Sequence, residues 1–210
     1  SSYSGRGYNG APAPQVSMSA FNDIGGGCFH NNCKITMADG SKIPIRKLKK
    51  GDSIRSIDEN SNFVTANVVT IVETLITTKL REMVHLKNGL IITPWHPIKI
   101  KNEWVFPNTI IEPTTTTCES MITLVLDKYH IGFINETPCI MLGHNFKESI
   151  LDHPYYGTSK VIEDLSKNYG YTMGHVVLKD NELSFVKENN VTKKMIITNI
   201  RTPATLVSSI

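Results

Sequence analysis

The chain has 210 residues, which allows one large domain or two small ones with a sizeable core. Its formal net charge is only +3, and the single short basic cluster at residues 46–50 is typical of a solvated surface, so we expect no nucleic-acid partner. No apolar run approaches the length of a membrane-spanning helix, which predicts a soluble piece without a membrane span.

The four cysteines, Cys28, Cys33, Cys118 and Cys139, form no C-x-x-C pair. This spacing argues against a structural zinc site, and four cysteines are too few for a disulfide scaffold in a chain of this length. We therefore expect reduced thiols, one or more of them reactive, with no metal and no cofactor. Reduced thiols favour an intracellular location without fixing it.

In chain order, residues 1–27 are rich in Gly, Ser and Pro and predict a flexible leader. Residues 29–145 predict short strands: two joined by the Asp39-Gly40 turn, three within residues 50–75 around a loop at 58–62, and more on either side of the Asn88-Gly89 turn. Further strands are expected within 103–113 and 121–145, with the four threonines at 114–117 as a loop. β-branched residues dominate these runs, which predicts an all-β region.

The pattern changes after Asn145. Residues 157–170 predict one helix, capped at Thr158 or Ser159 and ended by Gly170. Residues 175–200 predict strands interrupted at 180–181 and 189–190. We thus expect a leader (1–27), an all-β domain (28–145), and a C-terminal extension (146–210), packed on that domain or following it, with a helix and a few strands.

The run of three glycines before Cys28 raises a chemical possibility. A thiol beside a peptide carbonyl can attack it and form a thioester, provided that the amide is distorted, the thiol is activated and the departing amine receives a proton. Glycine at position 27 suits this reaction, because it tolerates strained backbone angles and places no side chain near the sulfur. The alternative is a buried free cysteine at the start of a domain.

Two further motifs add polar groups at strand ends. Thr93 and His96 lie three residues apart after an apolar strand, where a hydroxyl and an imidazole can polarise a carbonyl and protonate a leaving nitrogen. His144 and Asn145 follow another apolar strand, where the asparagine can cyclise with help from the histidine, and His130 can reach the same place from a neighbouring strand. The alternatives are a satisfied surface histidine and a solvent-facing turn.

Taken in this order, Gly-Cys-Phe, "MADGS", "LKKGDSI", Thr-x-x-His, Asp-x-x-His and Gly-His-Asn resemble the hedgehog–intein (Hint) superfamily of autoprocessing domains over residues 27–145. The run "HPYYGTSKVIEDL" at residues 153–165 is similar to the extension of a subgroup associated with von Willebrand factor A domains, called Vint. Such flanking domains are therefore expected elsewhere in the full-length protein.

The resemblance implies a horseshoe-like fold of long bent strands and a single-turnover reaction on the protein's own upstream polypeptide. It assigns Cys28 as the nucleophile that attacks the Gly27 carbonyl, with Thr93 and His96 acting on the scissile amide. At the other end it assigns His130 and His144 as assisting groups and Asn145 as the cyclising residue. By analogy with hedgehog proteins, Glu73 is a candidate base, although a surface strand residue is its plainer interpretation.

One departure from the family pattern is informative. Phe146 follows Asn145, where splicing requires a nucleophilic side chain to receive the acyl group. We therefore expect N-terminal cleavage or acyl transfer to water or a small amine or thiol, with cyclisation at Asn145 left open and standard splicing excluded. The alternatives are an inert Hint-fold spacer or interaction module and, third, a trans-acting cysteine hydrolase.

Overall fold

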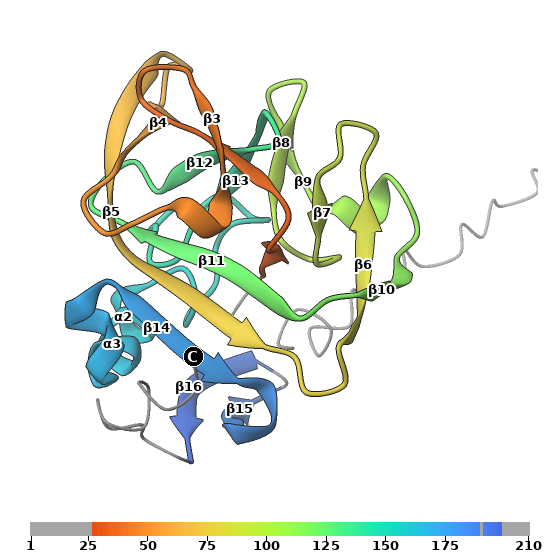
Figure 1. Cartoon of the computed structure of the whole chain (residues 1–210), viewed down its shortest axis with the longest axis vertical. Coiled ribbons are helices and arrows are strands. Elements are labelled where there is room, and N and C mark those ends of the chain that lie inside the picture. Colours follow the sequence, from red (N-terminus) through yellow and green to blue (C-terminus); the bar gives the residue numbers. More distant parts are fainter. Residues whose placement is uncertain (1–26, 190, 199–210) are drawn as a thin grey trace, which may run out of the picture.

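The computed structural model describes residues 27–189 and 191–198, which form mainly β-strands (Figure 1). The predicted leader therefore lies outside the described residues, apart from Gly27. The larger sheet has the order β10-β6-β7-β1-β11-β5-β14, and β4 also pairs with β5. Its strands are β1 (Phe29–His30), β4 (Ser53–Ile57), β5 (Phe63–Leu75), β6 (Leu80–His85), β7 (Ile91–Ile92), β10 (Thr114–Thr117), β11 (Ser120–Leu126) and β14 (His175–Lys179).

A second sheet has the order β3-β2-β12-β13-β8-β9, and β15 pairs with β16 in a separate hairpin. The strands of these two sheets are β2 (Lys34–Thr36), β3 (Lys42–Pro44), β8 (Ile98–Ile100), β9 (Glu103–Val105), β12 (Ile131–Ile134), β13 (Thr137–Ile140), β15 (Leu183–Glu188) and β16 (Val191–Ile197). The helices are α2 (Ser159–Ser166) and α3 (Tyr169–Met173), and the 3-10 turns are η1 (Ile45–Lys47), η2 (Pro107–Thr109) and η3 (Asp180–Glu182).

The long strand β5 connects the parts of the molecule. Its first five residues pair with β4, and the rest pairs with β11, with a register shift in β11 between Val125 and Leu126. Figure 1 shows β5 and β11 running side by side across the molecule, with β14 along the other edge of β5. The expected all-β, horseshoe-like fold with long bent strands is confirmed, as are the helix and strands near the C-terminus.

The main hydrophobic core lies between the two large sheets. Phe29 and Ile92 of the first sheet pack in one cluster with Ile35, Ile98 and Ile134 of the second, and none of these side chains is exposed. Burying an aliphatic or aromatic side chain of this size contributes about 1.5–3 kcal/mol. This core fixes β1 between β7 and β11, and therefore fixes the backbone that follows Cys28.

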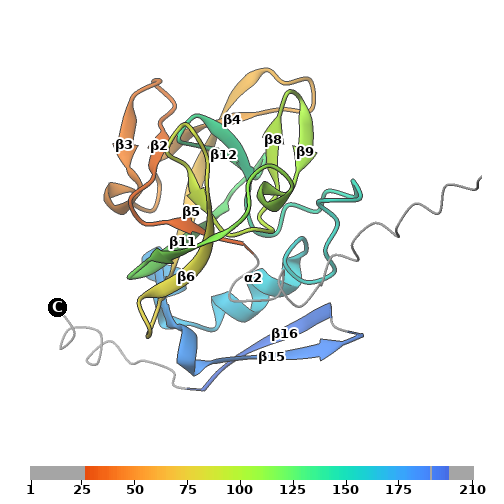
Figure 2. The same cartoon turned by 90° about the vertical axis from the view of Figure 1, so that its right-hand side faces the viewer.

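A second core joins the C-terminal residues to the larger sheet. Val72 of β5 and Val125 of β11 pack with Tyr155, Val161 and Val176 from the chain beyond Asn145. The β14 strand is parallel to β5, which pairs His175 with Ile71 and Lys179 with Leu75. Figure 2 shows the β15–β16 hairpin as a further layer beyond α2. The segment after Asn145 is thus built into the sheet through β14.

Three of the predicted local elements were wrong. The four threonines at 114–117 form the edge strand β10, because they are β-branched and pair with β6 from Met83 to Leu80. Residues 50–75 hold two strands, β4 and β5, and not three. The predicted helix is capped by Thr158 as expected but ends at Ser166. Asn168 then caps α3 by accepting from the Gly170 amide (2.9 Å), so Gly170 lies in the first turn of a second helix and does not end the first.

Candidate active site

The Gly27–Cys28 peptide bond lies in the interior, directly before β1. Gly27 has a φ of +98°, in a region that L-residues rarely adopt. A Cβ on Gly27 would lie 2.9 Å from Cβ and Cγ of His96, which is closer than real Cβ contacts. Glycine is therefore required here for two reasons, its backbone angle and the close approach of His96.

Thr93 holds the amide nitrogen of this bond. The β1 and β7 strands pair Phe29 with Ile92, and the next residues outward, Cys28 and Thr93, consequently face each other. The Cys28 N–H donates to the Thr93 hydroxyl at 3.0 Å, and the Thr93 N–H donates to the Cys28 carbonyl at 2.9 Å. The strand pairing thus fixes the plane of the amide that an acyl shift would break.

His96 is buried beside the same bond and has one unoccupied nitrogen. Its Nε2 donates to the Ile140 carbonyl at 2.6 Å, and its ring stacks against Phe29 with centroids 6.0 Å apart. Because a carbonyl only accepts, the proton is assigned to Nε2 and the lone pair to Nδ1. Nδ1 is buried and lacks a hydrogen-bond partner among the described residues. Burial lowers the pKa of His96 to about 4, so the ring is neutral near pH 7 and Nδ1 is free to accept a proton.

The Cys28 thiol is 1% exposed and is held in its protonated form. Burial raises its pKa to about 12, the neighbouring Cys118 raises it further, and the Arg81 guanidinium acts in the opposite direction. A thiol in this state is a weak nucleophile until a base removes its proton. The four cysteines are all buried as thiols, and none of them is joined to another by a disulfide bond.

Of the other predicted group, His130 directly precedes β12, whereas His144 and Asn145 follow β13. Burial lowers the pKa of His144 to about 4, with a further contribution from His130, and its Nδ1 accepts from the Phe146 N–H at 2.8 Å. The structure places the His130 main chain beside the strand end that leads to His144, through the bond from the Met141 N–H to the His130 carbonyl. It leaves the Asn145 side chain exposed, with a backbone φ of +60°. The main chain around β13 connects the two groups, since Ile140 accepts from His96 and Met141 donates to His130.

His153, from the extension, was not selected as a site residue from the sequence. Its Nδ1 accepts from the Tyr155 and Tyr156 amides at 3.1 and 3.0 Å, and burial lowers its pKa to about 4. His144 and His153 line a cavity of about 20 Å³ together with Thr123. That volume suits about one water molecule. The sequence signal was "HPYY", which indicated the subgroup but no side-chain role.

Glu73 occupies a different environment from the Cys28 thiol. Its carboxylate accepts from the Ser120 hydroxyl at 2.6 Å and lies 3.2 Å from His175 Nε2. These hydrogen bonds hold the pKa of Glu73 below its usual value, and the bond to His175 has the largest effect. Glu73 pairs with Ile122 on β11, whereas Met121, one residue earlier, packs with Cys28. Because successive strand residues point to opposite faces, Glu73 and the Cys28 cluster lie on opposite faces of the sheet.

Within residues 27–189 and 191–198, there is no cluster of three or more His, Cys, Asp or Glu side chains arranged to hold a metal ion. No helix in the same ranges is long and apolar enough to cross a membrane. The candidate site therefore consists of a thiol, a hydroxyl, an imidazole and a peptide bond.

Comparison with known families decides the classification. The sequence model of the family described as "Vint: Hint-domain" matches residues 27–196. The chain belongs to the Vint family of Hint domains. The match begins at Gly27, the residue whose carbonyl the candidate nucleophile adjoins, and continues through β14 and the β15–β16 hairpin. The resemblance seen in the sequence is therefore confirmed, including the Vint subgroup, and a Hint domain is in general a self-processing domain acting on its own chain.

Solved structures similar to this Vint chain include a DnaB intein from Synechocystis sp. PCC 6803 (17% identity, TM-score 0.45), which covers 55% of this chain and 98% of the intein. A bacterial intein-like domain from Clostridium thermocellum has 16% identity and a TM-score of 0.45, covering 54% and 97% of the respective chains. An intein from a hyperthermophile has 14% identity and a TM-score of 0.39, covering 55% and 99%. No curated protein matches the chain.

Proposed function

We propose that the protein cleaves its own chain at the Gly27–Cys28 bond through an N-to-S acyl shift. The observation that supports this most directly is the shared environment of the bond. The Thr93 hydroxyl accepts a hydrogen bond from the Cys28 N–H, and the Thr93 N–H donates to the Cys28 carbonyl. His96 packs directly on Gly27. We place the reaction in residues 28–145, with the segment from 146 packed on them.

In the proposed reaction, the Cys28 sulfur attacks the Gly27 carbonyl carbon. A carbon–sulfur bond forms, the bond to the Cys28 nitrogen breaks, and the thiol proton passes through His96 Nδ1 to that nitrogen. The neutral state of His96 suits this role, because it accepts the proton before returning it. The Thr93 hydroxyl keeps the amide nitrogen in line during the transfer.

The product of this step is a thioester at Gly27 and a free amine on Cys28. Water then attacks the thioester, the carbon–sulfur bond breaks, and the thiol is restored with Gly27 as a carboxylate. A small amine or thiol can take the place of water. Phe146 offers no nucleophile after Asn145, so the acyl group leaves the domain and splicing does not follow.

The experiment is to incubate the purified chain near neutral pH with buffer alone, a small thiol or hydroxylamine, and to weigh the products. We expect fragments 1–27 and 28–210, the former as an acid, a thioester or a hydroxamate according to the nucleophile added. Hydroxylamine should give the fastest release, because it attacks thioesters far more readily than amides. A chain that stays intact under all three conditions would favour the inert spacer or interaction module.

We further propose that the chain is not cut at Asn145. The Asn145 and Gly143 amides donate to the Gly157 and Tyr156 carbonyls at 2.7 and 2.9 Å, so the extension holds this segment at two points. A Cβ on Gly157 would lie 3.1 Å from the His144 ring, which shows how closely the two segments pack. Cyclisation would require this held backbone to rearrange around the asparagine.

The corresponding prediction concerns Asn145→Ala. Because the side chain is exposed and the backbone bonds remain, N-terminal cleavage should keep its products and its rate within a factor of about two. Mass analysis of the wild type over long incubation provides the other half of the test. A fragment beginning at Phe146 in the wild type, absent from the variant, would contradict the proposal.

A further inference from the structure

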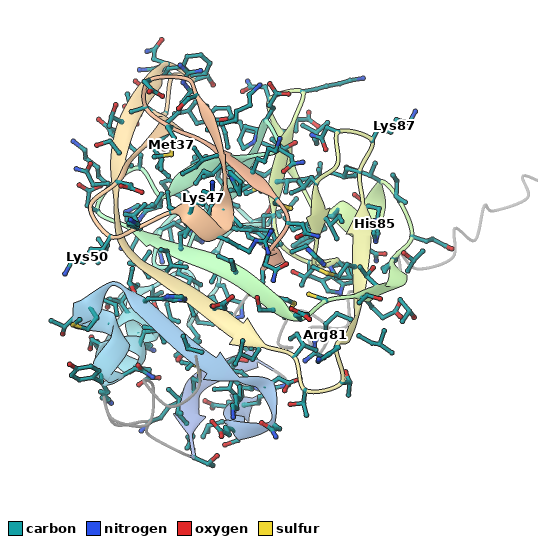
Figure 3. All side chains as sticks on the ribbon, in the orientation of Figure 1. Met37, Lys47, Lys50, Arg81, His85 and Lys87 are labelled. Carbon is teal, nitrogen blue, oxygen red and sulfur yellow. The ribbon has the colours of Figure 1, made fainter. Side chains whose placement is uncertain are left out.

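Arg81 lies in the same buried neighbourhood as the Cys28 thiol. The regular pairing of β6 with β10 places Arg81 and Met83 on the same face of β6. Met83 packs in one buried cluster with Cys28, Cys118 and Met121. Figure 3 labels Arg81 at the end of β6 that faces the C-terminal strands. The Arg81 guanidinium therefore lies beside the residues that pack around the Cys28 thiol.

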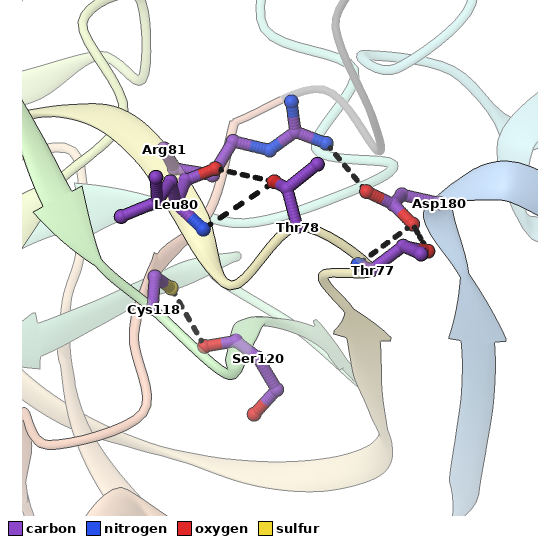
Figure 4. A network of polar contacts seen from close by, with 7 residues as sticks. All are labelled: Thr77, Thr78, Leu80, Arg81, Cys118, Ser120 and Asp180. Atoms are coloured by element: carbon purple, nitrogen blue, oxygen red, sulfur yellow. Dashed lines mark hydrogen bonds and ion pairs between the residues drawn. The ribbon is translucent and has the colours of Figure 1, made fainter.

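The C-terminal extension holds this guanidinium through Asp180. Arg81 Nη2 and Asp180 Oδ2 are 3.1 Å apart, and the two side chains are only 26% and 12% exposed. The other Asp180 oxygen accepts from the Thr77 amide at 3.0 Å and also from the Thr77 hydroxyl (Figure 4). The carboxylate is thus fixed on one side by the β5–β6 turn and fixes Arg81 on the other.

Three observations indicate that this arrangement serves the nucleophile. The Arg81 Nε is buried and lacks a hydrogen-bond partner among the described residues, so one N–H donor of the guanidinium is not engaged. Leu183, three residues after Asp180, packs against the cluster that contains Cys28. The positive charge also opposes the effect of burial on the pKa of both Cys28 and Cys118. The extension thereby contributes to the surroundings of the thiol by packing and by charge.

We propose that Asp180 and Arg81 are positioning residues for the acyl shift, with Asp180 holding the Arg81 guanidinium where it stabilises the negative charge that develops on the attacking group. This inference rests on the proposed function at Cys28. Arg81 gives up no proton in the step. The thiol proton still passes through His96 to the Cys28 nitrogen, and the charge is balanced electrostatically by the fixed cation.

The first test compares Asp180→Asn and Arg81→Met with the wild type in the full chain. The amide introduced by Asp180→Asn keeps an oxygen for the Thr77 N–H but loses the charge that orients Arg81. We expect thioester-dependent cleavage to slow about tenfold in Asp180→Asn and about 10²-fold in Arg81→Met, with Arg81→Lys between the wild type and Arg81→Met. Glu136→Gln, which breaks the exposed ion pair with Lys42, serves as the matched control and should leave the rate unchanged.

The second measurement does not require cleavage. Peptide mapping after timed alkylation gives the labelling rate of Cys28, with Cys33 in the same molecule as the internal standard. Loss of the cation should lower the Cys28 to Cys33 ratio in Arg81→Met, by tenfold for each unit by which the pKa of Cys28 rises. If the wild type does not cleave but the Cys28 to Cys33 ratio falls in Arg81→Met, the proposed function is rejected and the inference about Arg81 is not. An unchanged ratio and cleavage at wild-type rate in folded Arg81→Met would overturn the inference.

Discussion

Replacing Cys28 by alanine should abolish cleavage at the Gly27–Cys28 bond, with fragment 1–27 undetectable under conditions in which the wild type releases it. The sulfur is the atom that receives the acyl group in the proposed reaction, and no other step leads to a thioester at Gly27. The expected loss is therefore larger than about 10³-fold in the rate of release. The measurement is the mass-resolved time course with and without hydroxylamine.

Cys33→Ala is the matched control for this variant. Cys33 is also a buried thiol, and it packs in the main core rather than beside the scissile bond. Both variants remove one sulfur from the interior, so both should lower stability by a similar modest amount. Cleavage by Cys28→Ala at the rate of Cys33→Ala would contradict the acyl shift and favour hydrolysis by another group.

Replacing His96 by alanine should slow cleavage by about 10²–10⁴-fold, because the proposed proton acceptor and donor is removed. The variant also loses the bond to the Ile140 carbonyl, so His96→Gln is included to keep a donor at that point. We expect both variants to remain folded by circular dichroism and both to cleave slowly. Normal cleavage by either variant would remove His96 from the reaction.

The pH dependence distinguishes a chemical role of His96 from a structural one. In the wild type, the thiol is protonated and His96 is neutral throughout the neutral range, so the rate should be level from about pH 6 upward. Without His96, attack depends on the free thiolate. The rate should then rise about tenfold per pH unit until the pH approaches the pKa of the thiol, about 12.

These profiles are best measured above pH 6 because acid destabilises the fold. His96, His144 and His153 each have a folded-state pKa of about 4, below the unfolded value of about 6.5. Between these values the unfolded chain binds protons that the folded chain does not. The free energy of unfolding therefore falls as the pH drops from about 6.5 towards 4.

Local chemistry in the sequence predicted the parts of the site that strand pairing brings together. A thiol after a run of glycines and Thr-x-x-His after an apolar strand predicted residues that lie around one peptide bond. Turn residues such as Asp39-Gly40 and Asn88-Gly89 predicted hairpins for the same local reason. Glu73 shows what local pattern leaves undetermined, because a one-residue shift in strand register moves a side chain to the other face of the sheet.

The sequence by itself determined the all-β character, the family and the candidate thiol, because each depends on residue type and short-range order. Only the tertiary structure decided that His96 is neutral and that Asp180 reaches Arg81 near the thiol. It likewise showed that the chain beyond Asn145 completes the sheet. These features depend on burial and on contacts between residues about a hundred positions apart, such as Arg81 and Asp180. Local pattern carries no information about them.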